Sequence, residues 1–205
     1  MIKTYSNIVH KNEINKILSW MYEKDHYSDD RPQAYSKLVN INNNDWPKEE
    51  VYNFLKRINL KDNIEFASFF EQRKNLFGLH ADTGDGDQKT LGKNILIPLE
   101  FSDNATTVIF KNKWLYSAVK FYNAELTPNG DITQCTDFNS NKDIDENTYI
   151  NYLQHVERTK LKGLEIEQIY KWKLGDVLVF DRQHIHAAGF LTKPKKSLVL
   201  FTTKL

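Results

Sequence analysis

The expected fold depends most on residues 172–186, which read Trp-Lys-Leu-Gly-Asp-Val-Leu-Val-Phe-Asp-Arg-Gln-His-Ile-His. Gly175-Asp176 predicts a turn, and the continuous apolar run Val177–Phe180 predicts a strand that is covered on both faces. The polar residues 181–183 predict a second turn, after which the chain returns with histidines at positions 184 and 186. The stretch therefore predicts a β-hairpin that carries a histidine on its returning strand.

A second polar segment, residues 78–84, reads Gly-Leu-His-Ala-Asp-Thr-Gly. His80 and Asp82 are two apart at the end of a predicted strand, so both side chains are expected on the same face. One metal ion could bind both, although a strand-end histidine beside a turn aspartate is the plain alternative. If the hairpin returns a histidine towards this pair, the three side chains form the facial triad of non-haem Fe(II) oxygenases, which leaves three coordination positions open.

In this order, His80-Ala81-Asp82, Gly175-Asp176 and His186 resemble the motifs of the Fe(II)/2-oxoglutarate-dependent dioxygenases. The resemblance covers roughly residues 75–203, with matched residues only at its two ends. It implies that Fe(II) is bound by His80, Asp82 and His186, with 2-oxoglutarate and O₂ as co-substrates. The family's spacing after the glycine favours His186 over His184, but the two would share a face of an unbroken strand, so side-chain parity does not separate them.

The same resemblance implies a basic residue on the following strand, which holds the far carboxylate of 2-oxoglutarate. Lys195 and Ser197 are two apart and would point the same way, like the basic-x-Ser pattern of relatives. Lys196 has the more usual distance from the histidine in members that use lysine, where a point charge replaces the bidentate fork of arginine. We favour Lys195 narrowly over Lys196, and the plain alternative is a set of solvated lysines at a hairpin turn.

Further short segments rich in apolar and β-branched residues lie between turn residues, which is typical of strands. The expected strands are residues 64–71, 76–80, 94–101, 106–111, 117–122, 176–180, 185–187 and 197–202. Together with the helices below they predict an α+β, mainly β fold: a double-stranded β-helix (jelly-roll, cupin-like) core braced by N-terminal helices.

Amphipathic helices are expected where apolar residues recur at helical spacing. The stripes are Ile14, Ile17, Leu18 and Met21; Val51, Phe54, Leu55 and Ile58, with Asp45 as N-cap and Pro47 in the first turn; and Tyr149, Ile150, Leu153 and Val156, with Asp143 and Glu146 as a capping box. We expect a single domain, residues 1–205, with a helical N-terminal brace at 1–62 and the β core at 63–205, which carries an insertion at about 124–165.

Composition narrows the function classes. With 28 basic and 27 acidic residues the formal charge is +1, which disfavours a general electrostatic partner such as nucleic acid or a membrane surface. Cys135 is the single cysteine, so no internal disulfide is possible, and the N-terminus has no apolar signal segment. We therefore expect a cytoplasmic protein.

The resemblance implies a hydroxylase that acts on a C–H bond of a small molecule or a peptidyl side chain, with release of succinate and CO₂. Halogenating members replace the triad carboxylate with a small residue, so Asp82 disfavours halogenation. The nucleic-acid demethylases carry arginines after the distal histidine, and here none follows Arg182. Two alternatives remain: a cupin-like jelly-roll module that binds a sugar or small acid, and a zinc hydrolase with the same ligands, for which Asp181 is the only nearby candidate base.

Overall fold

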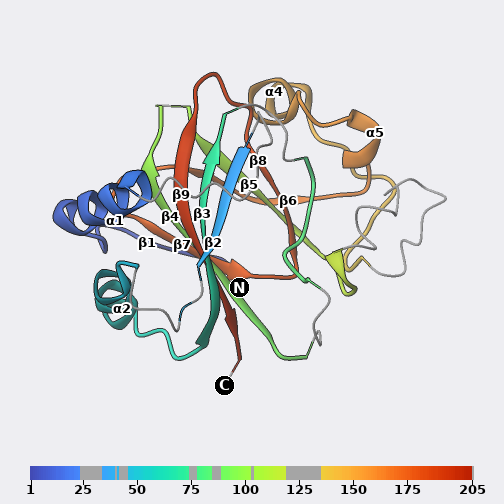
Figure 1. The fold of residues 1–205 in the computed structure, drawn as a ribbon. Coiled ribbons are helices and arrows are strands. Elements are labelled where there is room, and N and C mark those ends of the chain that lie inside the picture. The colour runs from blue at the N-terminus through green and yellow to red at the C-terminus, as the bar shows by residue number, and fades with distance from the viewer. Residues whose placement is uncertain are drawn as a thin grey trace.

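The computed structural model describes residues 1–23, 34–39, 41, 46–73, 78–84, 89–102, 104–118 and 135–204. Within these residues the chain is mainly β, with two antiparallel sheets and a few helices (Figure 1). The larger sheet has six strands in the order β1 (Lys3–Tyr5), β7 (Val177–Asp181), β4 (Leu91–Glu100), β9 (Lys195–Thr203), β3 (Asn63–Gln72) and β2 (Ala34–Val39). The smaller sheet has the order β6 (Ile166–Lys171), β5 (Thr106–Lys113) and β8 (His184–Ala188).

Helices cover the outer face of each sheet. The helical segments are α1 (Lys11–Glu23), α2 (Lys48–Arg57), α4 (Glu146–Thr148), the π-helical segment η2 (Tyr149–Leu153) and α5 (Arg158–Leu161). Figure 1 shows α1 and α2 on one side of the strands and α4 and α5 on the other. The amphipathic stripes explain this arrangement, because each apolar face must be buried against another element.

The larger sheet separates the helical core from the space between the sheets. Ile95, Ile97, Leu198 and Leu200 pack with apolar residues of α1 and α2 in one buried cluster. Residues of opposite parity on the same strands face the smaller sheet instead, since successive side chains of a strand alternate between faces. The smaller sheet buries its other face against η2 and α5, in a second cluster that contains Leu153 and Leu161. The inner faces of both sheets are therefore free to build a site.

Six expected strands agree with β3, β4, β5, β7, β8 and β9 to within a few residues at each end. The hairpin expected at 172–186 is wrong, because β7 pairs with β1 and β4 in the larger sheet, whereas β8 pairs with β5 in the smaller one. The strand expected at 76–80 is wrong in its described part: residues 78–79 are not extended in a sheet, and His80 forms only an isolated bridge with His186. Of the strand expected at 117–122, Ser117 and Ala118 are not in a strand, and the rest lies outside the described residues.

The N-terminal segment 1–62 was expected to be a helical brace, but it is not purely helical. Besides α1 and α2 it contains β1 and β2, which pair with β7 and β3 at the two edges of the larger sheet. β6 was also not expected; it pairs with β5. All three form through main-chain hydrogen bonds to strands distant in the sequence, which local periodicity does not report.

Two expected helix caps differ from the structure. The N-cap of α2 is Pro47, without a side-chain cap, and Asp45 lies outside the described residues. The N-cap of α4 is Asp145, not Asp143, because Asp145 has the right spacing to accept the hydrogen bond of the Thr148 amide at 2.9 Å. Of the helical stripe that follows, Tyr149, Ile150 and Leu153 lie in η2, whereas Val156 lies between η2 and α5. The expected insertion is described only from residue 135 onwards.

None of the helices in the described residues is long and apolar enough to span a membrane.

Candidate active site

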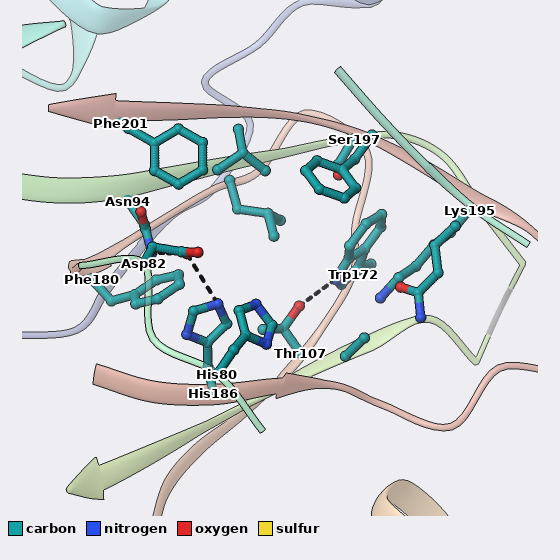
Figure 2. Close-up of a pocket in the computed structure, with 15 residues that line it drawn as sticks. His80, Asp82, Asn94, Thr107, Trp172, Phe180, His186, Lys195, Ser197 and Phe201 are labelled. Atoms are coloured by element: carbon teal, nitrogen blue, oxygen red, sulfur yellow. Dashed lines mark hydrogen bonds and ion pairs between the residues drawn. The ribbon is translucent and has the colours of Figure 1, made fainter. Parts of the chain in front are cut away.

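A cavity of about 170 Å³ lies between the two sheets (Figure 2). Strand β9 provides one wall through alternate residues, namely Lys195, Ser197, Val199 and Phe201. The other walls come from β3, β4, β5, β7 and β8 and from the segment around His80. The cavity therefore joins residues from distant parts of the chain, including all three that the sequence suggested as metal ligands.

His80, Asp82 and His186 lie together at one end of the cavity (Figure 2). The main chains of His80 and His186 exchange two hydrogen bonds, of 3.0 and 2.9 Å, which brings the ring centroids within 4.1 Å of each other. The amide of Asp82 donates to the main-chain oxygen of Arg182 at 3.0 Å. Potential ligand atoms of the three side chains all lie within 4.8 Å of one another, a separation that one ion could bridge.

The second nitrogen of each imidazole is held by the backbone. Nδ1 of His80 lies 3.0 Å from the oxygen of Gly78, and Nδ1 of His186 lies 2.9 Å from the oxygen of His184. Because a carbonyl oxygen can only accept, each Nδ1 carries the proton and donates it. This is the arrangement that orients a histidine for metal binding through Nε2.

The carboxylate of Asp82 completes the group. Its Oδ2 lies 3.2 Å from Nε2 of His186 and accepts a hydrogen bond from Nδ2 of Asn94 at 2.6 Å. Since Nδ1 of His186 already donates its proton, the nitrogen that faces Asp82 must either gain a second proton or share a cation with the carboxylate. A divalent metal bound between them would satisfy both acceptors at once.

The protonation states of this group suit a metal. Desolvation, together with the neighbouring His186, lowers the pKa of His80 to about 4. Desolvation by itself would raise the pKa of Asp82, but His186, His80 and the Asn94 hydrogen bond together hold it at about 2. At neutral pH His80 is therefore neutral and Asp82 ionised, as metal ligation requires.

No protein-family model and no curated protein matches the sequence, whereas solved structures match the whole fold. A prolyl-4-hydroxylase from Pseudomonas putida is 9% identical and superposes with a TM-score of 0.54, over 100% of this chain and 92% of that one. HygX from Streptomyces hygroscopicus, solved with nickel, 2-oxoglutarate and hygromycin B, is 11% identical, with a TM-score of 0.57 over 99% and 82%. The epimerase SnoN from nogalamycin biosynthesis, described as α-ketoglutarate-dependent, is 8% identical, with a TM-score of 0.60 over 99% and 78%.

The chain has the fold of the 2-oxoglutarate- and Fe(II)-dependent oxygenases. The structure thus confirms the expected resemblance at the level of the fold. It also brings together, inside this oxygenase fold, the histidines and the aspartate on which the resemblance rested.

Lys195 lies at the other end of the cavity (Figure 2). Its ammonium donates to the main-chain oxygen of Thr106 at 3.1 Å and lies 4.3 Å from the ring centroid of Trp172. Trp172 is fixed in turn by a 2.9 Å hydrogen bond from its Nε1 to Oγ1 of Thr107. Lys195 is only 5% exposed, and burial lowers its pKa to about 7.

Lys196 does not line the cavity. It points to the opposite face of β9, where its Nζ lies 2.9 Å from Oε1 of Glu100 and contacts the hydroxyl of Tyr22. Lys196 therefore ties β9 to β4 and to α1. Ser197 shares the parity of Lys195 and lines the cavity.

His184 and Asp181 lie apart from the group at His80. Nδ1 of His184 lies 2.8 Å from the oxygen of Phe110, and its Nε2 faces Asp181 at 3.7 Å. The Asp181 carboxylate binds the ammonium groups of Lys93 and Lys113. Burial would raise its pKa, but these hydrogen bonds hold the pKa well below its usual value. Neither residue lines the cavity, so Asp181 is badly placed to act as the base of a hydrolase.

Two residues that support the group were not recognised in the sequence. Asn94 contacts Asp82 from the beginning of an apolar strand, and Arg182 contacts its main chain from the turn between β7 and β8. Arg182 does fall within residues 172–186, on which the fold prediction rested, but its polarity indicated only a turn.

Proposed function

We propose that the protein is an Fe(II)- and 2-oxoglutarate-dependent oxygenase, in which His80, Asp82 and His186 bind the metal and Lys195 binds the far carboxylate of 2-oxoglutarate. The two sheets then represent the double-stranded β-helix of this class. The observation that carries the proposal is one cavity with two histidines and a carboxylate at one end and a buried lysine at the other.

The donor set supports iron. Two imidazoles and one carboxylate on one side of an ion leave the remaining positions open towards the cavity, as non-haem Fe(II) oxygenases require. When bound, iron and 2-oxoglutarate supply the oxidation of a substrate C–H bond, with release of succinate and CO₂. The chain itself would hold iron and 2-oxoglutarate in fixed positions relative to the substrate. It also lines the cavity with apolar side chains, among them Leu96, Phe180 and Val199.

The surroundings of Lys195 support an anionic ligand. No carboxylate pairs with its ammonium among the described residues; the ammonium contacts a main-chain oxygen and an aromatic face. A buried ammonium without a counter-ion is costly, which is why burial depresses its pKa. A carboxylate bound beside it would restore the charged form and form a charge-assisted hydrogen bond. We assign this role to Lys195 instead of Lys196, with Ser197 as a neighbouring donor.

For the primary substrate we propose a small molecule or a peptidyl side chain that is hydroxylated. The fold neighbours include enzymes solved with either kind of ligand, hygromycin B in HygX and a fragment of hypoxia inducible factor in a prolyl hydroxylase from Trichoplax adhaerens. The near-neutral charge disfavours nucleic acid as the substrate.

The test is an anaerobic titration of metal-free protein with Fe(II) and then with 2-oxoglutarate, followed by visible absorption. A weak metal-to-ligand charge-transfer band is expected, because 2-oxoglutarate would chelate a His₂-carboxylate iron. Air should then release succinate, faster when the correct substrate is present. Iron that binds without producing the band on addition of 2-oxoglutarate would contradict the proposal.

A further inference from the structure

Asn94 has an unusual environment for a buried amide. It lies on β4, opposite Phe180 of β7 on one side and Phe201 of β9 on the other. Its exposed fraction is 0%, and both of these aromatic residues line the cavity with it. Figure 2 shows Asn94 beside Asp82, below Phe201. An amide between two rings has little contact with water, so its hydrogen bonds are strengthened by the low local dielectric.

The nitrogen and the oxygen of this amide have different surroundings. Nδ2 donates to Oδ2 of Asp82 at 2.6 Å, which sets the orientation of the amide because a carboxylate can only accept. Oδ1 is buried and has no hydrogen-bond partner among the described residues. A buried polar atom without a partner loses its hydration with no hydrogen bond to replace it, so such atoms are rare in folded proteins.

Asn112 shows what a structural asparagine looks like in this protein. It is also 0% exposed, but its Nδ2 donates to the oxygen of Thr136 at 3.0 Å and its Oδ1 accepts from the amide of Glu165 at 2.8 Å. Asn112 thus ties three segments together with both ends of its amide. The side chain of Asn94 makes a single hydrogen bond within the described residues, and that bond goes to a candidate metal ligand.

The bond matters because Asp82 comes from a segment without sheet pairing of its own. His80 is fixed by its main-chain exchange with His186, whereas the described main chain at 81–83 belongs to no strand. The side chain of Asp82 therefore depends on its contacts to keep one rotamer. Its Oδ2, which faces His186, is the atom that Asn94 holds.

We propose that Asn94 is a positioning residue for the metal site: its Nδ2 fixes the Asp82 carboxylate in the orientation that metal binding requires. This inference rests on the proposed function, since it takes His80, Asp82 and His186 to be the ligands. Outer-shell partners of this kind typically change metal affinity by about 10- to 100-fold.

The test compares Asn94→Leu, which has a similar shape and no donor, with Asn112→Leu as the matched control. The dissociation constant for Ni²⁺ is measured by calorimetry, and the visible d–d spectrum of the Co²⁺ form reports the coordination geometry. Asn94→Leu should bind Ni²⁺ about 10- to 100-fold more weakly and show an altered Co²⁺ spectrum. Asn112→Leu should lose thermal stability but keep both properties of the wild type.

Asn94→Ala provides a second variant with less risk of overpacking, and thermal unfolding of the metal-free proteins shows which variants fold. If folded Asn94 variants bind Ni²⁺ as tightly as the wild type, with the same Co²⁺ spectrum, the positioning role is wrong. That outcome differs from failure of the proposed function, in which the wild type itself would bind no divalent metal or produce no charge-transfer band with Fe(II) and 2-oxoglutarate.

Discussion

Arg182 donates a hydrogen bond from Nε to the main-chain oxygen of Asp82 at 2.9 Å, across 100 residues of sequence. The main chain of Arg182 accepts the amide hydrogen bond of Asp82 in return. The guanidinium lies beside the stacked rings of Phe66 and Phe201, 5.6 and 5.5 Å from their centroids, and it also pairs with Glu65. A buried cation that contacts two aromatic rings and a carboxylate therefore fixes the backbone of the candidate metal ligand.

Replacing Arg182 with methionine should weaken both the fold and the metal site. The hydrogen bonds of a charged donor are lost, which should lower the free energy of unfolding by about 2–3 kcal/mol. Ni²⁺ affinity should fall by about tenfold or more, because Asp82 loses an outer-shell support. Arg57→Met is the control, since Arg57 pairs with Glu13 between α2 and α1. Chemical denaturation and calorimetry measure the two effects; equal metal affinity in both variants would contradict the assignment.

Asp82→Ala should abolish 2-oxoglutarate-dependent succinate release and leave the fold largely intact. Loss of a ligand should weaken Ni²⁺ binding by more than the roughly 100-fold limit for outer-shell partners. His186→Ala should behave in the same way, whereas His184→Gln should retain metal binding because its imidazole faces Asp181. Succinate assays and circular dichroism check this, and decarboxylation by Asp82→Ala at the wild-type rate would disprove the triad.

Substitutions of Lys195 and of Lys196 should have different effects on the affinity for 2-oxoglutarate. Lys195→Met removes the buried ammonium from the cavity and should raise the dissociation constant of 2-oxoglutarate about 10- to 100-fold, since a hydrogen bond to a charged group contributes about 1.5–3 kcal/mol. Lys196→Met should leave that constant unchanged, because Lys196 pairs with Glu100 instead. Calorimetric titration of the Ni²⁺-loaded variants with 2-oxoglutarate measures both. The opposite pattern would transfer the role to Lys196.

Affinity for 2-oxoglutarate should fall as the pH rises above about 7, the value to which burial lowers the pKa of Lys195. Below that pH the ammonium is already charged and the affinity is constant. Above it the neutral amine must take up a proton to pair with the carboxylate, so the dissociation constant should rise by about tenfold per pH unit. Lys195→Arg removes this dependence, because guanidinium stays charged. A pH-independent constant in the wild type would show that Lys195 does not meet the ligand.

Local geometry explains why part of the site could be predicted from the sequence. Lys195 and Ser197 share a parity on β9, so they had to lie on one face whatever the rest of the fold did. His186 lies on β8, which follows β7 directly in the sequence but belongs to the other sheet, so the tertiary structure decides that it meets His80. His80 and Asp82 do converge, although the expected strand there is absent. The motif predicted this convergence correctly, but in the structure it arises from the His80–His186 bridge and not from a strand.

The sequence by itself determined the mainly β class and both N-terminal helices, because these depend on periodicity and spacing within short windows. The three candidate metal ligands and Lys195 came from the motif that the sequence shares with the dioxygenases. Only the tertiary structure decided that Lys195 faces the cavity while Lys196 pairs with Glu100. It also brought Asn94 and Arg182 to Asp82. The physical reason is that each of these contacts joins strands or turns far apart in the chain, and a hydrogen bond across such a distance leaves no periodic trace in either segment.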